Sequence, residues 1–316
     1  MANLKEIRDR IVSVKNTRKI TEAMRLVAAA KVRRAQDQVL KSRPFADKLA
    51  RVLQNIQTRM QFESSDSPLL SKRDVKTISL VCITADRGLC GGYNTNIIKK
   101  VETRYAELTK QGFSTNLILV GKKAISYFQN RKDKYLIKSS FKELEQVPTA
   151  KDSEGITSEV LAEFLSENAD RVEIIYTKFI TLVSCAPVVQ TLLPLDPQGI
   201  AAENDEIFRL TTKNSQLRVE KTNINKDLND KLPSDIVFEQ SPDQLLDSLL
   251  PLYLQNQILR ALQESAASEL ACRMTAMNNA SDNAKELANN LNLTYNKARQ
   301  AAITQEILEV VGGSAI

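Results

Sequence analysis

The loop Ala85–Asn94 (ADRGLCGGYN) is the segment whose residue types come closest to a ligand-binding motif. Backbone amides in a glycine-rich turn between a strand and a helix can bind phosphate. The loop matches neither GxxxxGK[ST] nor GxGxxG, and no lysine follows where a phosphate-binding loop has one. We therefore interpret it as a glycine-rich turn that the fold requires and that can touch a partner, with nucleotide binding as the alternative.

Groups suited to catalysis are scarce in the rest of the chain. The sequence has no histidine, which removes the usual general base, the usual zinc ligand and any nucleophile that histidine would activate. Four cysteines, Cys82, Cys90, Cys185 and Cys272, are widely spaced and form no CxxC motif, so neither a disulfide framework nor a zinc site is indicated. We expect no catalytic residue, no metal and no cofactor, and a reducing compartment.

The positive charge of the chain is concentrated near its beginning. Residues 1–51 contain fourteen Lys/Arg against five Asp/Glu, whereas the whole chain has a net charge of +6. Clustered basic residues suit either a nucleic-acid backbone or an acidic protein surface. The first aromatic residue is Phe45, so the stacking side chains of many nucleic-acid arms are missing there. A solvated helix face and an acidic protein partner are equally compatible with this composition, and a nucleic acid is the third alternative. The basic residues in question are Arg18, Lys19, Arg25, Lys31, Arg33 and Arg34.

The two ends of the chain are predicted to be very long helices. Residues 1–67 contain no glycine and one proline, and residues 252–311 contain neither. At 1.5 Å per residue each helix would be roughly 85 to 90 Å long, whereas a compact globule of this size is only about 50 Å across. We therefore predict an antiparallel coiled coil of an N-terminal helix, residues 1–67, and a C-terminal helix, residues 242–316.

The predicted seam between these helices contains few large apolar side chains. Leu4, Ile7, Ile11 and Val14 follow coiled-coil spacing, but the same phase then meets Arg18, Thr21 and Arg25. An alanine stripe buries less apolar area than a leucine stripe and holds two helices together less strongly. We therefore expect a slender coil that is stabilised partly by something wrapped around it. An ordinary helical bundle is the alternative. The C-terminal seam is mostly small residues: Ala284, Ala288, Leu291, Tyr295, Ala298 and Ala302.

The end of the C-terminal helix carries large apolar side chains, in contrast to the small residues of its seam. Its last turns form a broad apolar face ahead of Gly312 and Gly313, which we expect to stop the helix. Such a face is expected to be buried in an apolar socket of another protein. The face consists of Ile303, Ile307, Leu308, Val310 and Val311.

Residues 68–241 are predicted to form a small α/β domain with a largely parallel sheet. Strand patterns at 75–84, 115–120 and 172–184 alternate with helical patterns at 95–110, 122–130 and 155–168. Residues 197–233 are polar and interrupt this pattern, which suggests an inserted β-hairpin. No signal or transit peptide and no stretch long enough to span a bilayer is visible, so we expect no direct membrane insertion.

Four segments of the sequence resemble the gamma subunits of rotary F-type ATP synthases. They are KEIRDRIVSVKNTRKITEAMRLVAAAKVRRAQ near the start, ITADRGLCGGYN in the middle, and ELACRMTAMNNASDNA and NKARQAAITQEILEVVGGSAI near the end. The resemblance implies a central rotor shaft, one copy per complex, inside a hexameric ring of alpha and beta subunits. It also implies contacts of the α/β domain with the epsilon subunit and the membrane c-ring, and no binding of nucleic acid.

The resemblance also implies roles for individual residues. Met24 and Arg25 match the family's coupling segment, and Arg273 lies at a similar level on the C-terminal helix. Arg299, Gln300, Thr304 and Glu306 match the segment that contacts a beta-subunit loop. All of these are partner contacts, because ATP chemistry in the family takes place on the beta subunits.

The insertion 197–233 resembles an extra segment of photosynthetic gamma subunits, in which it restrains ATP hydrolysis. Chloroplast members carry a redox-active cysteine pair there, which this chain lacks. The resemblance is therefore to the cyanobacterial type, on the cytoplasmic face of the thylakoid membrane.

Overall fold

The computed structural model describes residues 4–60, 69, 73–143, 147–181, 184–195, 206–213, 216–223 and 242–313. The chain divides into two compact units. Unit 1 comprises Met1–Ala30 and Arg273–Ile316, and unit 2 comprises Lys31–Cys272. Two long helices, α1 (Leu4–Met60) and α5 (Pro242–Gly313), each contribute to both units. The prediction of two very long terminal helices is confirmed.

Unit 2 is built on a five-stranded sheet with the order β3-β2-β1-β4-β5. Strands β3, β2, β1 and β4 are parallel to their neighbours, and β5 pairs antiparallel with β4. The largely parallel sheet is thus confirmed. The strands are β1 (Thr77–Ile83), β2 (Ser114–Val120), β3 (Leu136–Phe141), β4 (Arg171–Phe179) and β5 (Cys185–Leu193).

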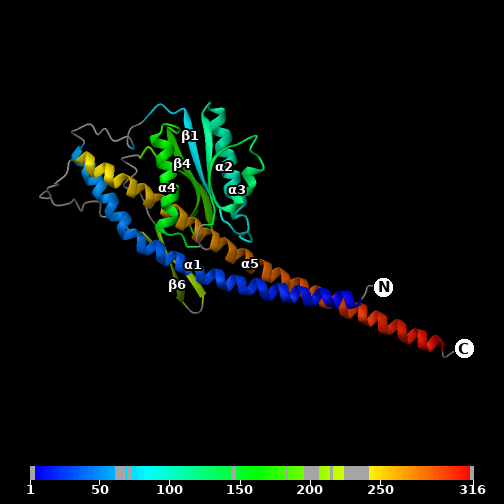
Figure 1. Ribbon diagram of the computed structural model, residues 1–316. Helices are drawn as coiled ribbons and strands as arrows, with labels where there is room; N and C mark the ends of the chain where they lie inside the picture. The colour runs from blue at the N-terminus through cyan, green and yellow to red at the C-terminus, as the bar shows by residue number, and fades with distance from the viewer. Residues whose placement is uncertain are drawn as a thin grey trace. The chain divides into compact units, whose positions relative to one another are not determined.

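Helices cover both faces of this sheet (Figure 1). One face packs on α2 (Tyr93–Lys110) and α3 (Lys122–Gln129), with Leu80 and Leu119 among the strand residues in that core. The other face packs on α4 (Ala150–Leu165) and the first part of α5, with Val81 and Ile118 in the core. The alternation follows from the two-residue period of a strand, which sends neighbouring side chains to opposite faces.

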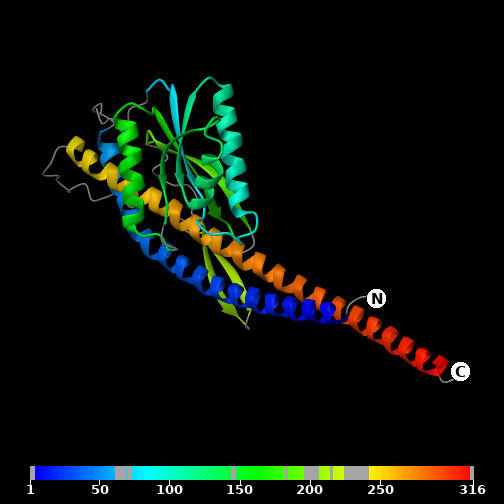
Figure 2. The same ribbon diagram turned by 45° about the vertical axis from the view of Figure 1, so that its right-hand side comes forward.

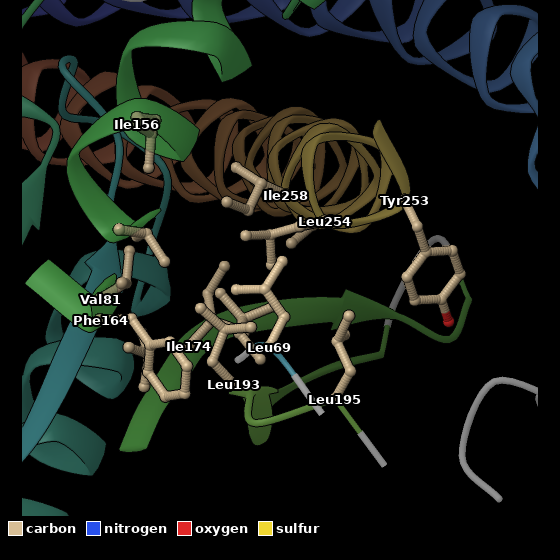
Figure 3. Close-up of a cluster of buried hydrophobic side chains, with 14 of the residues drawn as sticks. Leu69, Val81, Ile156, Phe164, Ile174, Leu193, Leu195, Tyr253, Leu254 and Ile258 are labelled. Carbon is tan, nitrogen blue, oxygen red and sulfur yellow. The ribbon is translucent and has the colours of Figure 1, made fainter. Parts of the chain in front are cut away.

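Helix α5 begins at Pro242, and Pro251 lies inside it. An internal proline normally disfavours a helix. Here the surrounding turns bury Leu250, Leu254 and Ile258 on the sheet, and this burial outweighs the proline penalty. Figure 3 shows Leu254 and Ile258 of α5 facing Ile174 and Leu193 of the sheet, with Ile156 and Phe164 of α4 alongside.

Polar residues fix the edges of unit 2. Arg104 of α2 donates two hydrogen bonds to the buried carboxylate of Glu173 on β4, at 2.7 and 2.8 Å. Asp170 accepts hydrogen bonds from the backbone N–H groups of Lys76 and Thr77, both at 2.8 Å, at the start of β1. These contacts hold α2 and the end of the α4–β4 loop to the sheet.

A second, two-stranded sheet follows β5 in sequence. Its strands β6 (Glu206–Lys213) and β7 (Gln216–Asn223) pair antiparallel, with Glu206 opposite Asn223. The predicted hairpin in the insertion is therefore confirmed. The rest of 197–233 lies outside the described residues.

Candidate functional site: the paired terminal helices

In unit 1 the helices α1 and α5 lie side by side and run in opposite directions (Figures 1 and 2). On α1, Leu4, Ile7 and Val14 are half-buried and Ile11 is buried, whereas every described residue between them is exposed. This exposure pattern is the seam that the spacing predicted. The apolar seam residues of α1 are thus used for pairing with α5.

The seam of α5 consists mainly of small residues, as the sequence indicated. Ala284 and Ala288 are buried, and the four seam positions that follow are half-buried. Met277 and Ser281 continue the buried stripe toward the start of unit 1. The four half-buried positions are Leu291, Tyr295, Ala298 and Ala302.

A polar contact crosses the seam on the C-terminal side of Val14 of α1. The Arg25 guanidinium donates to Glu22 Oε1 at 2.7 Å, and Ser281 Oγ of α5 donates to Glu22 Oε2 at 3.3 Å. The hydrogen bond from Arg25 lowers the pKa of Glu22, and the same bond raises the pKa of Arg25. We call Glu22, Arg25 and Ser281 the polar crossing. Its interhelical bond, from Ser281 to Glu22, joins α5 to α1 through polar groups.

Three of the predicted contact residues, which we call the lower residues, lie in unit 1 on the side of the polar crossing. Met24 is half-buried, Arg25 belongs to the crossing, and Arg273 is buried at 8% exposure on α5. Their side chains are therefore at least partly engaged within unit 1. The sequence did not single out Glu22 and Ser281; an acid three residues before Arg25 was the available signal for Glu22.

The predicted upper contact residues are in a different environment. Arg299, Gln300, Thr304 and Glu306 are all exposed on α5, with Thr304 Oγ1 donating to the Gln300 carbonyl at 2.9 Å. From Arg273 to Arg299 the helix rises about 40 Å. The structure therefore places the lower and upper residues at two separate levels of the same helix.

Large apolar side chains are exposed along the outside of unit 1. On α1, Ile20, Leu26 and Val27 are 60%, 57% and 54% exposed. On α5 the predicted apolar tip is open over its whole length, from Ile303 at 45% to Val310 at 72%. Such continuous exposure on a helix pair is typical of a surface that binds other protein chains.

The glycine-rich loop of unit 2 is closed by its own side chains. Asn94 Oδ1 accepts from the Ala85 N–H at 3.0 Å, and Asn94 Nδ2 donates to Cys90 Sγ at 3.1 Å. Asp86 accepts from the Lys122 N–H at 2.7 Å, at the start of α3. These bonds favour the interpretation of the loop as a structural turn.

A pocket of about 420 Å³ lies beside this loop, at the carboxyl ends of β1 and β2. Its lining includes Asp86, Glu143 and Glu269 as well as Arg87 and Lys122. Lys122 Nζ also pairs with Glu143 at 3.1 Å. A lining with this mixture of charges does not favour a polyphosphate, whose binding needs an excess of positive charge. Over the described part of the chain, no cluster of three acidic or cysteine side chains suited to a metal ion occurs.

Comparison with known proteins decides among these possibilities. Residues 3–315 match the ATP synthase family. The ATP synthase gamma chain of Prochlorococcus marinus strain MIT 9312 is 91% identical over 316 residues, covering 100% of both chains. The chain belongs to the ATP synthase gamma chain family. Its members are the central stalk subunits of rotary ATP synthases. The gamma chain of strain MIT 9303 is 74% identical over 314 residues, covering 99% of both chains.

Solved structures share the fold of this gamma chain. The rotor of the Euglena gracilis mitochondrial ATP synthase matches with a TM-score of 0.61 at 19% identity, over 95% of this chain and 98% of that one. The central stalk and c-ring structure from Tetrahymena thermophila matches with a TM-score of 0.56 at 26% identity, over 83% and 99%. Among the described helices, none is long and apolar enough to cross a bilayer.

Proposed function

We propose that this gamma chain turns with a membrane c-ring and that its paired terminal helices drive conformational change at catalytic beta subunits. The observation that carries the proposal is the contrast within unit 1 between a thin seam and exposed outer apolar side chains. A shaft shifts the equilibrium of a catalytic site only by contacting its states unequally. The helix pair has basic residues on α1, small residues along the seam and large apolar residues at the tip of α5. It therefore presents different surfaces at different rotation angles.

The proposed partners are an alpha–beta hexameric ring around unit 1 and an epsilon subunit and c-ring at unit 2, with one gamma chain per complex. The basic surface of α1 suits an acidic ring interior, where opposite charge steers assembly. We propose that the complex lies on the cytoplasmic face of the thylakoid membrane, with this chain as a peripheral subunit. The Prochlorococcus origin of the relatives at 91% and 74% identity supports this proposal.

In this proposal the chain carries no catalytic residue and no cofactor. The closed loop Ala85–Asn94 and the mixed charges of the pocket beside it both argue against a nucleotide site. The rival function, a nucleic-acid-binding arm, is not favoured, because the family match accounts for both the basic helix and the apolar tip.

The proposal is tested by reconstitution. Added to purified alpha and beta subunits, the chain should restore ATPase activity, and nuclease treatment should leave the complex intact. An alpha–beta mixture that stays inactive, although the added gamma chain is folded and bound, would contradict the proposed role.

The coupling residues are tested by a double substitution at the upper level. Arg299→Ala with Gln300→Ala removes a charge and an amide from an exposed turn of α5. Hydrogen bonds to charged groups contribute about 1.5 to 3 kcal/mol. We therefore expect at least a tenfold loss of ATP synthesis with assembly intact. Asn296→Ala with Lys297→Ala removes the same kinds of group one turn earlier, where both residues are also exposed. Equal rates of synthesis for the two double variants in membrane vesicles would refute the assignment.

We further propose that the insertion 197–233 restrains ATP hydrolysis when the proton gradient is low. The hairpin β6–β7 gives it a folded element that can prefer one rotational state, and a preference of about 1.4 kcal/mol shifts a population ratio tenfold. Replacing residues 198–232 by a short Gly/Ser link should raise the ATPase rate of the soluble complex. A Gly/Ser segment of the original length separates the role of the hairpin from that of chain length. If both variants assemble and hydrolyse ATP at the parental rate, the insertion is not a brake.

A further inference from the structure

Two cysteines that are far apart in sequence meet in unit 2. Cys185 begins β5, the edge strand of the sheet, and Cys272 lies on α5 as the last residue of unit 2. They are 87 positions apart in sequence, yet their Sγ atoms are 3.0 Å apart. Both residues are partly exposed, and both are thiols in this structure. Sequence spacing gave no sign of this pair.

The other two cysteines are in a different situation. Cys82 lies within β1 and is fully buried, and burial raises the pKa of its thiol to about 12. Cys90 is 2% exposed, and its sulfur already accepts a hydrogen bond from Asn94 Nδ2 at 3.1 Å. Reagents in solution therefore reach Cys185 and Cys272 more readily, and a disulfide-forming reaction needs such access.

The two neighbouring thiols also differ in acidity. The hydrogen bond from Cys272 lowers the pKa of Cys185 to about 7, against the opposing effect of burial. The pKa of Cys272 is raised, most of all by the same hydrogen bond. Burial and the nearby Cys185, Cys90 and Glu269 raise it further. Cys185 is thus the more acidic of the two thiols, which suits the attacking sulfur of a thiol–disulfide exchange.

We propose that Cys185 and Cys272 form a reversible dithiol–disulfide site that joins β5 to α5. The oxidant is a small-molecule or protein disulfide. The Cys185 thiolate attacks one sulfur of that disulfide, which gives a mixed disulfide and releases one thiolate. Cys272 then loses its proton and attacks Cys185 Sγ, which breaks the mixed bond and releases the second thiolate. The chain loses two electrons and two protons, and the oxidant gains two electrons to become two thiols.

The bond would act on the fold at a defined place. It would fix α5 to the open edge of the sheet at the last residue of unit 2. The closed loop would contain β5, the whole insertion and residues 242–272 of α5. Cross-linking a long loop limits the unfolded chain, so the oxidised protein should melt at a higher temperature than the reduced one. Neither cysteine belongs to the insertion, so this site is distinct from a cysteine pair within it.

Peptide mapping of the full chain tests the proposal. The reduced protein is incubated with oxidised glutathione at pH 7.5, free thiols are then alkylated, and the digest is analysed by mass spectrometry. We expect one peptide pair joined through Cys185 and Cys272, two hydrogen masses lighter than the separate peptides, in the parent chain and in the Cys82→Ser/Cys90→Ser variant. Cys185→Ser or Cys272→Ser should abolish the pair. Oxidation that joins other cysteines, or leaves Cys185 and Cys272 separate, overturns the proposal.

A second measurement separates a coupled pair from two merely accessible thiols. In the parent chain the alkylation rate of Cys185 should rise with a midpoint near pH 7. Cys272→Ala removes the hydrogen-bond donor beside Cys185, so the midpoint should move upward, with the rate at pH 7 several-fold lower. Cys90→Ser, in which the Cys185–Cys272 contact is kept, is the control. An unchanged midpoint in Cys272→Ala would show that the two thiols are not coupled.

Discussion

Unit 2 and unit 1 bury very different residues. In unit 2 the inner part of β2, Leu117–Val120, is completely buried, and Phe128 and Phe164 are completely buried as well. In unit 1 the most buried residues include Ala28, Met277 and Ser281, and Ala284 is still 9% exposed. Since stabilisation follows the apolar area removed from water, the sheet unit stabilises itself and the helix pair gains much less from its own contacts.

The difference indicates a division of labour within one chain. A rotor needs one part that keeps its shape under load and one part whose surface is reserved for other subunits. The exposed Ile20, Leu26 and Val310 would be an aggregation risk on an isolated protein, and the proposed ring of alpha and beta subunits would cover them. Four substitutions probe this comparison.

The largest expected effect is in the sheet unit. Phe164→Ala removes a fully buried ring that packs on Val81 and Ile174, so unit 2 should lose about 4 kcal/mol of unfolding free energy. Leu136→Ala on β3 is the control, because Leu136 is 58% exposed and its removal should change stability by less than about 0.5 kcal/mol. Urea unfolding followed by circular dichroism measures both. Similar losses for the two variants would mean that the sheet core is not the main source of stability.

Removing a buried charge partner should have the next largest effect. Arg104→Met leaves the Glu173 carboxylate buried, with Arg171 at 3.9 Å as its remaining ion pair among the described residues, and should cost about 3 kcal/mol. Adding Glu173→Met should recover most of that loss, because no unpaired charge then remains. The account of this ion pair is wrong if the double variant unfolds as easily as the single one.

A seam substitution should act only on unit 1. Ile11→Ala shortens a buried side chain on an open helix pair and should cost about 2 kcal/mol, the low end for such a change. Hydrogen exchange should accelerate in 4–30 and 273–313, with no change in β1 and β2. Faster exchange in the sheet strands would contradict the independence of the two units.

The smallest expected effect is a pH dependence of unit 2. Burial opposes ionisation of Asp170, but the N–H groups of Thr77 and Lys76 outweigh it and lower its pKa. A carboxyl whose folded pKa lies below its unfolded value, about 3.9, adds stability above that value and loses it as the pH falls through the folded pKa. Unfolding of the parent chain should therefore become easier below about pH 4, by about 1 kcal/mol for this group. Asp170→Asn should be less stable at pH 7 and show a weaker acid dependence.

Much of this architecture could be predicted from the sequence, because the periodic segments are long. The seam from Leu4 to Val14 and the stripe from Ala284 to Ala302 repeat often enough to show which faces pair. The buried strands β1, β2 and β4 carry continuous apolar runs. Strands β3 and β5 were missed, because β3 alternates exposed and half-buried residues at the sheet edge, and β5 contains Pro187, which an edge strand tolerates.

The contacts between distant residues could not be predicted. Ser281 bonds to Glu22 and Cys272 meets Cys185 only because the helices and the sheet bring them together. The residues assigned to partner contacts were chosen by resemblance, and their roles remain predictions because the partners themselves decide them.

Hydrogen exchange of the full chain, free and reconstituted with alpha and beta subunits, measures whether the helix pair depends on its surroundings. We expect amides of 4–30 and 273–313 to exchange many-fold more slowly inside the ring, while amides of β1, β2 and β4 keep the same rates. Two results would contradict the view that the helix pair is stabilised by what surrounds it. One is that the amides of unit 1 are already fully protected in the free chain; the other is that exchange slows mainly in the sheet.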